Sequence, residues 1–294
     1  MALIKRVAGL TTGIIAVATT MGVLLTVMAL PLVVPAASGV RIGDAYWNSL
    51  STELADPAMP VHSIMRDSEG NEIARFYSQN RVLVSIDDIS PYVVEALVST
   101  EDERFYEHHG VDLRGVTRAA ANNFVGGGRQ GASTITQQLA KNTLILNAAT
   151  DEEVAAAQEV SVDRKVQEIR YALALEETHT KEEIVEDYLN VVFYANGVYG
   201  IGTAAKYYFN KSASDLTIAE SALLVGIVNS PSAYDPINNP EGAKKRRNLV
   251  IDRMISSGSI AKEDGEAAKA EDITLNVTRS PNGCGVSDYP FYCQ

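Results

Sequence analysis

Cysteine is nearly absent from this sequence, which has only Cys284 and Cys293, both close to its C-terminal end. No CxxC pair occurs, and no cluster of cysteine and histidine has the spacing of a zinc site. In an oxidising compartment the two cysteines could form a local disulfide bond, and the alternative is a pair of free thiols near the end of the sequence. The sequence leaves both alternatives open, but it argues against a structural zinc protein.

Positive charge is also scarce, because 25 lysines and arginines stand against 37 acidic residues and the net charge is −12. No broad basic face is available for a nucleic-acid backbone, so nucleic acid is not an expected partner. A small basic pocket for a phosphorylated ligand remains allowed. The composition, 46% hydrophobic and 21% charged, is typical of a folded protein. A chain of 294 residues has room for one substantial domain with appendages and two domains at most.

Charged residues are missing altogether from Val7 to Val34. A membrane-spanning helix needs about 20 apolar residues, so this run is long enough to be one. Lys5 and Arg6 precede it, and the positive-inside rule then leaves the N-terminus cytoplasmic and the rest outside. The alternative is a cleaved signal peptide ending near the small residues 36–38, but the apolar run exceeds the usual length of a signal core. We therefore predict a tip and an uncleaved anchor over residues 1–37 of a single-pass plasma-membrane protein.

The rest of the chain predicts a linker over residues 38–60, a mainly α domain over 61–274 and the start of an interdomain linker over 275–294. Short strands are expected within residues 61–86, on either side of a turn at Asp67–Asn71. Residues 148–160 fit a mobile connection or a short surface helix. Capping residues and apolar periodicity predict helices over residues 91–98, 112–124, 133–146, 161–178, 180–189, 217–228, 241–257 and 262–270. The caps that we assign to them include Ser90, Asp112, Ser133, Thr180 and Thr217.

Two adjacent acids, Glu101 and Asp102, follow an apolar helix and precede Phe105, His108 and Gly110. Partial burial at such a place would raise the pKa of a carboxyl and make it a usable base. Acid pairs after helices are more often solvated caps or ion-pair partners. By itself this cluster is a weak indication of catalysis.

The segment GASTITQQLAKN follows a glycine-rich stretch. If Ser133 caps the helix, then Thr134, Gln138 and Lys141 lie at i, i+4 and i+7 on one face. A hydroxyl, an amide and an ammonium at a helix start suit a phosphate and sugar hydroxyls. An ordinary polar helix face is the alternative.

Arg164 and Glu168 stand one helical turn apart in the segment RKVQE. By itself this spacing indicates a surface ion pair, worth only about 0.3–0.5 kcal/mol.

Taken together and in this order, EDERFYEHHG, GASTITQQLAKN, RKxxE, KEEIVEDYLN and RRNLV resemble the five motifs of the peptidoglycan glycosyltransferase family. This is the transglycosylase domain of class A penicillin-binding proteins, and the likeness covers residues 85–255. The resemblance implies a mainly α, lysozyme-like domain with a small β segment at its entrance, preceded by one transmembrane helix. It also implies an enzyme that polymerises lipid II into β-1,4-linked glycan strands with inversion and releases the polyprenyl diphosphate.

The resemblance assigns roles residue by residue. Glu101 matches the base that deprotonates the acceptor 4-hydroxyl, and Glu168 matches the second essential acid, beside the departing diphosphate. Phosphate-binding positions are matched by Lys141, Arg164 and Lys165. Positions that shape the cleft or bind the substrate are matched by Asp102, Phe105, His108, Thr134, Gln138 and Asn142.

Further expectations follow from the family. A divalent cation, Mg²⁺ or Mn²⁺, could accompany the diphosphate, whereas no organic cofactor and no protein metal site are expected. The partners would be lipid II, the growing glycan chain, membrane lipid and other cell-wall synthesis proteins, and moenomycin would bind as a mimic of the donor. The complete triad of SxxK, SxN and KTG motifs that a transpeptidase domain carries does not occur, because the sequence has no KTG, which suggests a chain truncated before such a domain.

Two segments have a simpler interpretation. The segment KEEIVEDYLN reads as a supporting helix with one apolar face. The basic run from Lys244 to Arg247 is expected to be exposed, where it would orient the fifth motif, meet anionic lipid or simply be solvated. Two rival functions also remain: a muramidase or lytic transglycosylase, and a catalytically silent scaffold.

Overall fold

The computed structural model describes residues 46–57, 59–124, 133–159, 161–284 and 291. The chain divides into two compact units, residues 1–52 with 112–132 and residues 53–111 with 133–294. The first contains helix α4 (Leu113–Phe124), which begins directly after Asp112 as predicted. The predicted anchor lies outside the described residues. Among the helices that are described, none has both the length and the apolar character needed to cross a membrane.

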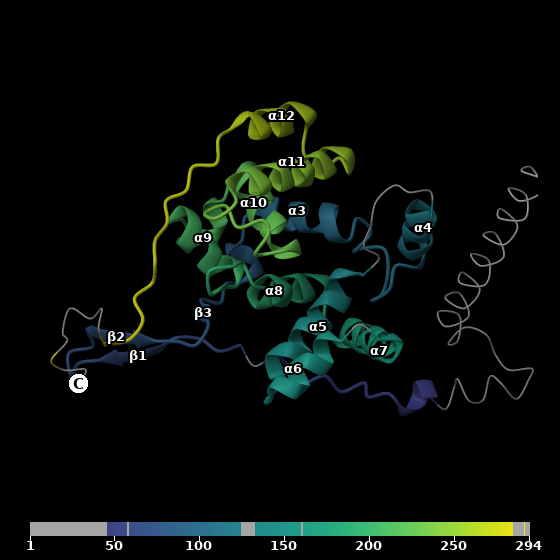
Figure 1. Cartoon of the computed structure of the whole chain (residues 1–294), viewed down its shortest axis with the longest axis horizontal. Helices are drawn as coiled ribbons and strands as arrows, with labels where there is room; N and C mark the ends of the chain where they lie inside the picture. The colour runs from purple at the N-terminus through teal and green to yellow at the C-terminus, as the bar shows by residue number, and fades with distance from the viewer. Residues whose placement is uncertain (1–45, 58, 125–132, 160, 285–290, 292–294) are drawn as a thin grey trace, which may run out of the picture. The chain divides into compact units, whose positions relative to one another are not determined.

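An antiparallel hairpin opens the second unit, as the sequence predicts. Strand β1 (Ser63–Arg66) pairs with β2 (Glu72–Phe76), and the Asp67 carboxylate accepts hydrogen bonds from two backbone amides in the turn between them. The segment after the last helix returns to this hairpin, where the amide of Gly283 donates to the carbonyl of Arg75 (Figure 1). Cys284 is disulfide-bonded, and Cys293 lies outside the described residues.

Helices build most of the second unit (Figure 1). They are α3 (Pro91–Glu101), α5 (Ile135–Asn147), α6 (Asp151–Gln158), α7 (Val162–Thr178), α8 (Lys181–Val191), α9 (Ile201–Phe209), α10 (Ile218–Asn229), α11 (Pro240–Ser256) and α12 (Lys262–Ala270). The two-residue strands β3 (Asn80–Arg81) and β4 (Val198–Tyr199) pair in parallel, and the short 3-10 turns η1 (Ile86–Asp88) and η2 (Ala213–Asp215) complete the unit. The prediction of a mainly helical chain with few strands is confirmed.

The capping chemistry explains where most helices begin. Thr180 and Thr217 each form the predicted capping box with a glutamate three residues later, and Ser161 caps α7. The prediction for α5 is wrong by one residue, because Thr134 caps this helix and Ser133 does not. The hydroxyl of Ser133 instead accepts a hydrogen bond from Lys165.

Three other segments differ from or refine the prediction. Helix α3 does not end at Val98 but continues to Glu101. Helix α9 was not predicted; it begins after Gly200 at φ 77° and ends at Asn210 in the left-handed conformation. Residues 148–160 contain a short surface helix, α6, which has no buried residue.

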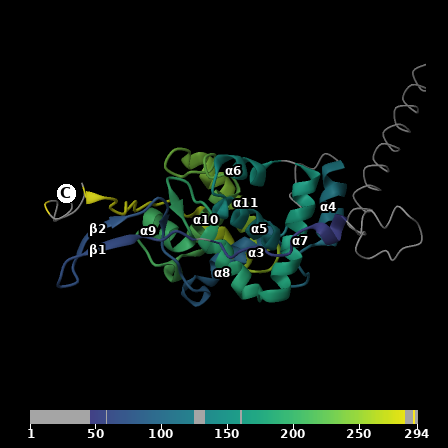
Figure 2. The ribbon, with the colours of Figure 1, turned by 90° about the horizontal axis from the view of Figure 1, so that it is seen from below.

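The core of the second unit is one contiguous apolar cluster. Helix α10 is apolar on nearly all sides and packs against α3 and α11, while α5 packs against α7 and α8. Figure 2 shows these helices from below, with the β1–β2 hairpin extending away from them.

The basic run on α11 contradicts the expectation of an exposed patch. Arg247 is buried, and its guanidinium donates to the carbonyls of Lys269 and Glu271. Arg246 is mostly buried, and its guanidinium lies over the ring of Tyr234. Four consecutive helical residues span more than one turn, so they cannot all face solvent.

Candidate active site

Glu101 is the last residue of α3, and its side chain is 17% exposed. The Nε2 of Gln138 on α5 donates to its Oε2 over 3.0 Å. The Nη2 of Arg246 on α11 lies 3.6 Å from its Oε1. Three helices therefore meet at one carboxylate, with a neutral donor on one oxygen and a cation beside the other.

Arg246 is a site residue that the sequence analysis placed on an exposed patch. Burial lowers the pKa of its guanidinium from the usual value, and the Glu101 carboxylate opposes that shift. An arginine keeps its charge even when its pKa falls moderately, so the buried cation needs a nearby anion. The position of Arg246 in the RRNLV motif was the feature of the sequence that could have indicated its place beside Glu101.

Asp102 is buried, and its hydrogen bonds hold together the loop that follows α3 and fix this loop to the start of α5. Its carboxylate accepts from the Nε2 of His108, at 2.9 and 3.0 Å, and from the backbone amide of Ile135 at 3.1 Å. A carboxylate at the first turn of α5 also complements the positive end of that helix. Phe105, in the same loop, is fully buried. The predicted residues of the first motif come together, and Asp102, Phe105 and His108 organise the loop that follows α3.

Gly110 closes this loop against α7. Its φ is 73°, and a Cβ at this position would lie 2.9 Å from the carbonyl oxygen of Ala172, so both conformation and space require glycine. The hydroxyl of Thr134 donates to the carbonyl of Gly110 at 2.7 Å and accepts a hydrogen bond from the backbone amide of Gln137. The predicted site residue Thr134 therefore joins the loop to the start of α5.

Glu168 on α7 is only 3% exposed, so the surface ion pair suggested by its spacing is a buried one. Arg164 Nη1 donates to its Oε2 at 2.6 Å, and Lys165 Nζ donates to its Oε1. Lys165 also donates to Ser133 Oγ at 2.9 Å and to Gln137 Oε1 at 2.8 Å. Both oxygens of this carboxylate are thus occupied by cations.

The two acids are linked through neighbouring residues of α5. Glu101 binds Gln138, and Glu168 binds Lys165, which in turn binds Gln137. Lys141, farther along α5, is exposed, and the described residues include no partner for its ammonium; Asn142 beside it is partly exposed. The first turns of α5 therefore connect the Glu101 group with the Glu168 group.

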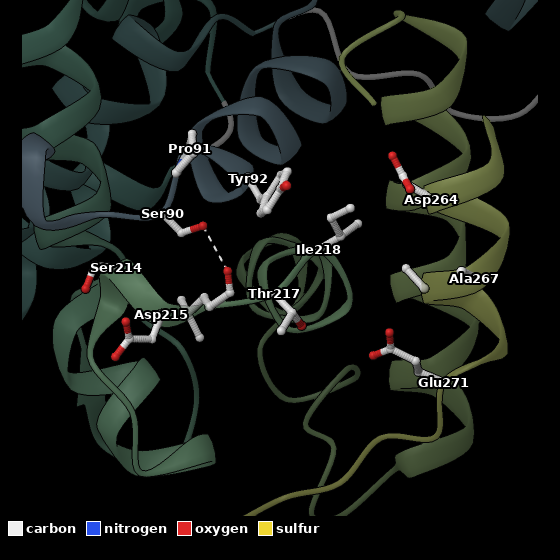
Figure 3. Close-up of a pocket in the computed structure, with 12 residues that line it drawn as sticks. Ser90, Pro91, Tyr92, Ser214, Asp215, Thr217, Ile218, Asp264, Ala267 and Glu271 are labelled. Carbon is white, nitrogen blue, oxygen red and sulfur yellow. Dashed lines mark hydrogen bonds between the residues drawn. The ribbon is translucent and has the colours of Figure 1, made fainter. Parts of the chain in front are cut away.

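A separate cavity of about 470 Å³ lies elsewhere in the fold. Figure 3 shows Tyr92 at the start of α3, Thr217 and Ile218 at the start of α10, and Asp264 and Glu271 in and after α12 around this space. A second cavity of about 220 Å³ adjoins it. None of the predicted site residues lines either cavity.

Comparison with known proteins decides the family. A model of the Transglycosylase family matches residues 69–255, a range that includes every element that meets at Glu101 and Glu168. The chain belongs to the transglycosylase family.

Its relatives are longer proteins. Penicillin-binding protein 1F of Bacillus subtilis is 40% identical over 214 residues, covering 72% of this chain and 28% of the relative. Penicillin-binding protein 1A of Escherichia coli is 38% identical over 224 residues, covering 76% and 25%. A crystal structure of penicillin-binding protein 1A from Haemophilus influenzae is similar with a TM-score of 0.41 and 20% identity, covering 77% of this chain and 22% of that chain. The chain thus spans about a quarter of the length of the curated relatives named here.

Proposed function

We propose that this protein is a peptidoglycan glycosyltransferase, which joins lipid II units into a β-1,4-linked glycan and releases polyprenyl diphosphate. The observation that carries the proposal is the contrast between the two acids. Glu101 is partly exposed beside an amide donor and one cation, whereas Glu168 is buried with a cation on each oxygen. One carboxylate suits proton abstraction and the other suits a site for phosphate.

The proposed reaction follows from this contrast. Glu101 takes the proton of the acceptor 4-hydroxyl, and the electron pair of that oxygen forms a bond to the anomeric carbon of the donor. The bond from this carbon to the diphosphate oxygen breaks, and its electron pair leaves with the diphosphate. Attack opposite an α-linked diphosphate gives a β linkage, which is inversion.

The leaving group sets the requirement at the second acid. A diphosphate departs without protonation if its developing charge is neutralised. Glu168 holds Arg164 and Lys165 in place, and 36% of the Lys165 side chain remains exposed. Lys141 adds a third cation on α5. We assign Glu168 the role of positioning these cations beside the diphosphate.

The same geometry favours a glycosyltransferase over a glycosidase. A muramidase or lytic transglycosylase must protonate a poor alkoxide leaving group with a carboxylic acid. Both oxygens of Glu168 accept hydrogen bonds from cations, so neither oxygen is placed to deliver a proton to a leaving group. A silent scaffold would have no need of a buried acid between two cations, since that arrangement carries a desolvation cost.

The side chains of this site are not arranged to bind a divalent cation as protein ligands. The carboxylates of Glu101 and Glu168 are already engaged, and the described residues hold no group of three metal-ligating side chains. A divalent ion that assists the reaction would enter as the counter-ion of the diphosphate.

The place of action belongs to the same proposal. The charge-free run over residues 7–34 would anchor the protein with its catalytic unit on the outer face of the plasma membrane, where a lipid-linked donor lies. A lysozyme-like arrangement of the core helices and binding of moenomycin in the donor site are further parts of the proposal.

Product analysis tests this function. The purified full chain in detergent is incubated with labelled lipid II or with preformed glycan, and the products are separated by size. We expect polymer from lipid II, blocked by moenomycin, and no cleavage of glycan. Glycan cleavage without polymerisation would identify the protein as a glycosidase. Inactivity on both substrates would favour a catalytically silent scaffold.

A further inference from the structure

The amide of Gln138 stands between Glu101 and a buried tyrosine. Its Nε2 donates to Glu101 Oε2 at 3.0 Å, and its Oε1 accepts from the hydroxyl of Tyr188 at 3.0 Å. A carboxylate can only accept hydrogen bonds, so the nitrogen side of the amide must face Glu101. The oxygen side must then face Tyr188, and the phenol has to be the donor.

Tyr188 is well suited to donate. It is completely buried on α8, and burial, assisted by the negative charge of Glu101, raises the pKa of its hydroxyl well above the usual value. The phenol therefore keeps its proton throughout the physiological range. Helix α8 is held by its capping box at Thr180 and packs directly on α5, so the donor has a fixed position.

We propose that Tyr188 is a positioning residue for the transfer reaction, which acts on Glu101 through the orientation of the Gln138 amide. The inference rests on the proposed function, since it concerns the same carboxylate. Without the phenol, Gln138 Oε1 would lose its partner, and the amide could rotate or turn its oxygen toward Glu101. Helix α8, predicted only to support the cleft, would thus set the direction of one hydrogen bond to the base.

A merely structural tyrosine is the competing explanation, and the protein supplies two matched controls. Tyr194 is equally buried, and its hydroxyl has no hydrogen-bond partner among the described residues. Tyr208 is also buried, and its hydroxyl donates to the carbonyl of Tyr194 at 2.7 Å, away from Glu101. Each loses the same single oxygen when it is replaced by phenylalanine.

The activity test compares Tyr188→Phe, Tyr194→Phe and Tyr208→Phe in the full chain with labelled lipid II. We expect kcat to fall about tenfold in Tyr188→Phe with little change in KM, because the base is misdirected and the substrate contacts remain. Tyr194→Phe keeps the wild-type kcat, and Tyr208→Phe lowers the melting temperature without lowering kcat. Equal kcat values in Tyr188→Phe and wild type, or equal losses in Tyr188→Phe and Tyr208→Phe, would overturn the proposal.

Two further measurements separate this inference from the proposed function. In a Gln138→Ala background, Tyr188→Phe should cause no additional loss of kcat, because the residue acts through the amide. The side-chain amide signals of Gln138 in ¹⁵N NMR require no turnover: they should move toward those of free glutamine in Tyr188→Phe only. If the wild-type protein is inactive on lipid II while these signals shift as expected, the proposed function is wrong, but the proposal that Tyr188 orients the Gln138 amide is supported. If they stay unchanged in Tyr188→Phe, the positioning fails whatever the activity.

Discussion

At the scale of single residues, surroundings distinguish side chains of the same chemical type. Glu101 and Glu168 are both glutamates on helices, yet one has an amide and a single cation near it and the other has a cation on each oxygen. The proposed roles of Glu101 as base and of Glu168 as cation holder rest on these contacts. The neighbours of each acid should therefore matter as much as the acid itself.

Arg246 provides a first prediction. Arg246→Leu removes the cation beside Glu101 and leaves that carboxylate in a part-buried site without its charge partner. We expect polymerisation of lipid II to fall at least about tenfold, since loss of a charged partner costs about 1.5–3 kcal/mol. Lys245→Leu, at the exposed neighbouring position, is the control and should retain wild-type rates. Equal rates in both variants would remove Arg246 from the site.

Glu168 provides a second prediction. Glu168→Gln leaves Arg164 and Lys165 without their counter-charge, so the two cations repel each other and lose their fixed positions. We expect the affinity for lipid II to fall together with kcat, as measured by binding to the detergent-solubilised protein and by initial rates. Unchanged affinity for the donor would contradict the role as cation holder.

At the scale of secondary-structure elements, caps and turns decide where the site residues lie. Capping boxes at Thr180 and Thr217 were predictable, because the side chain and its partner are three residues apart. The cap of α5 was not, because Ser133 and Thr134 are equally good caps locally. The choice depends on Gly110, 24 residues away, which accepts from Thr134.

A third prediction tests this cap. Thr134→Val keeps the shape of the side chain but removes both the cap of α5 and the hydrogen bond to Gly110. We expect the free energy of unfolding in urea to fall by about 1–2 kcal/mol. Ser133→Ala, which removes only an acceptor for Lys165, should cost less. The reverse order would support the predicted cap at Ser133.

A buried ion pair between Lys181 and Glu176 links the loop after Glu101 with three helices. Lys181 Nζ donates to Glu176 and, at 2.7 Å, to the carbonyl of His108, while Thr136 donates to Glu176 Oε1 at 2.6 Å. The ammonium also lies 4.3 Å from the centre of the Phe105 ring. The loop after Glu101 is thereby tied to α5, α7 and α8.

A fourth prediction concerns this pair. Lys181→Met leaves the Glu176 carboxylate buried without its cation, and we expect a loss of about 3–5 kcal/mol in unfolding free energy. Lys181→Met with Glu176→Leu should recover part of this loss, because no buried charge remains. A double variant less stable than Lys181→Met would show that the ion pair is not the source of the effect.

At the scale of the whole molecule, the ordered motifs predicted the family, and the match over residues 69–255 confirms it. They did not predict that α5 would connect Glu101 to Glu168, nor that Arg246 would reach Glu101 from 145 positions away. Local patterns encode caps and apolar faces, whereas such contacts depend on how helices cross. Helix α9 was missed for a related reason, since buried residues lie around most of its surface and form no single apolar stripe.

The variant Glu101→Gln tests most directly the proposal that Glu101 is the base and that Glu168 holds the cations. Binding of lipid II and its polymerisation are measured side by side for wild type, Glu101→Gln and Glu95→Gln, a control on the same helix. We expect wild-type affinity in all three and a loss of polymerisation of about 10²–10⁴-fold in Glu101→Gln alone. Polymerisation retained in Glu101→Gln, or lost equally in Glu95→Gln, would contradict it.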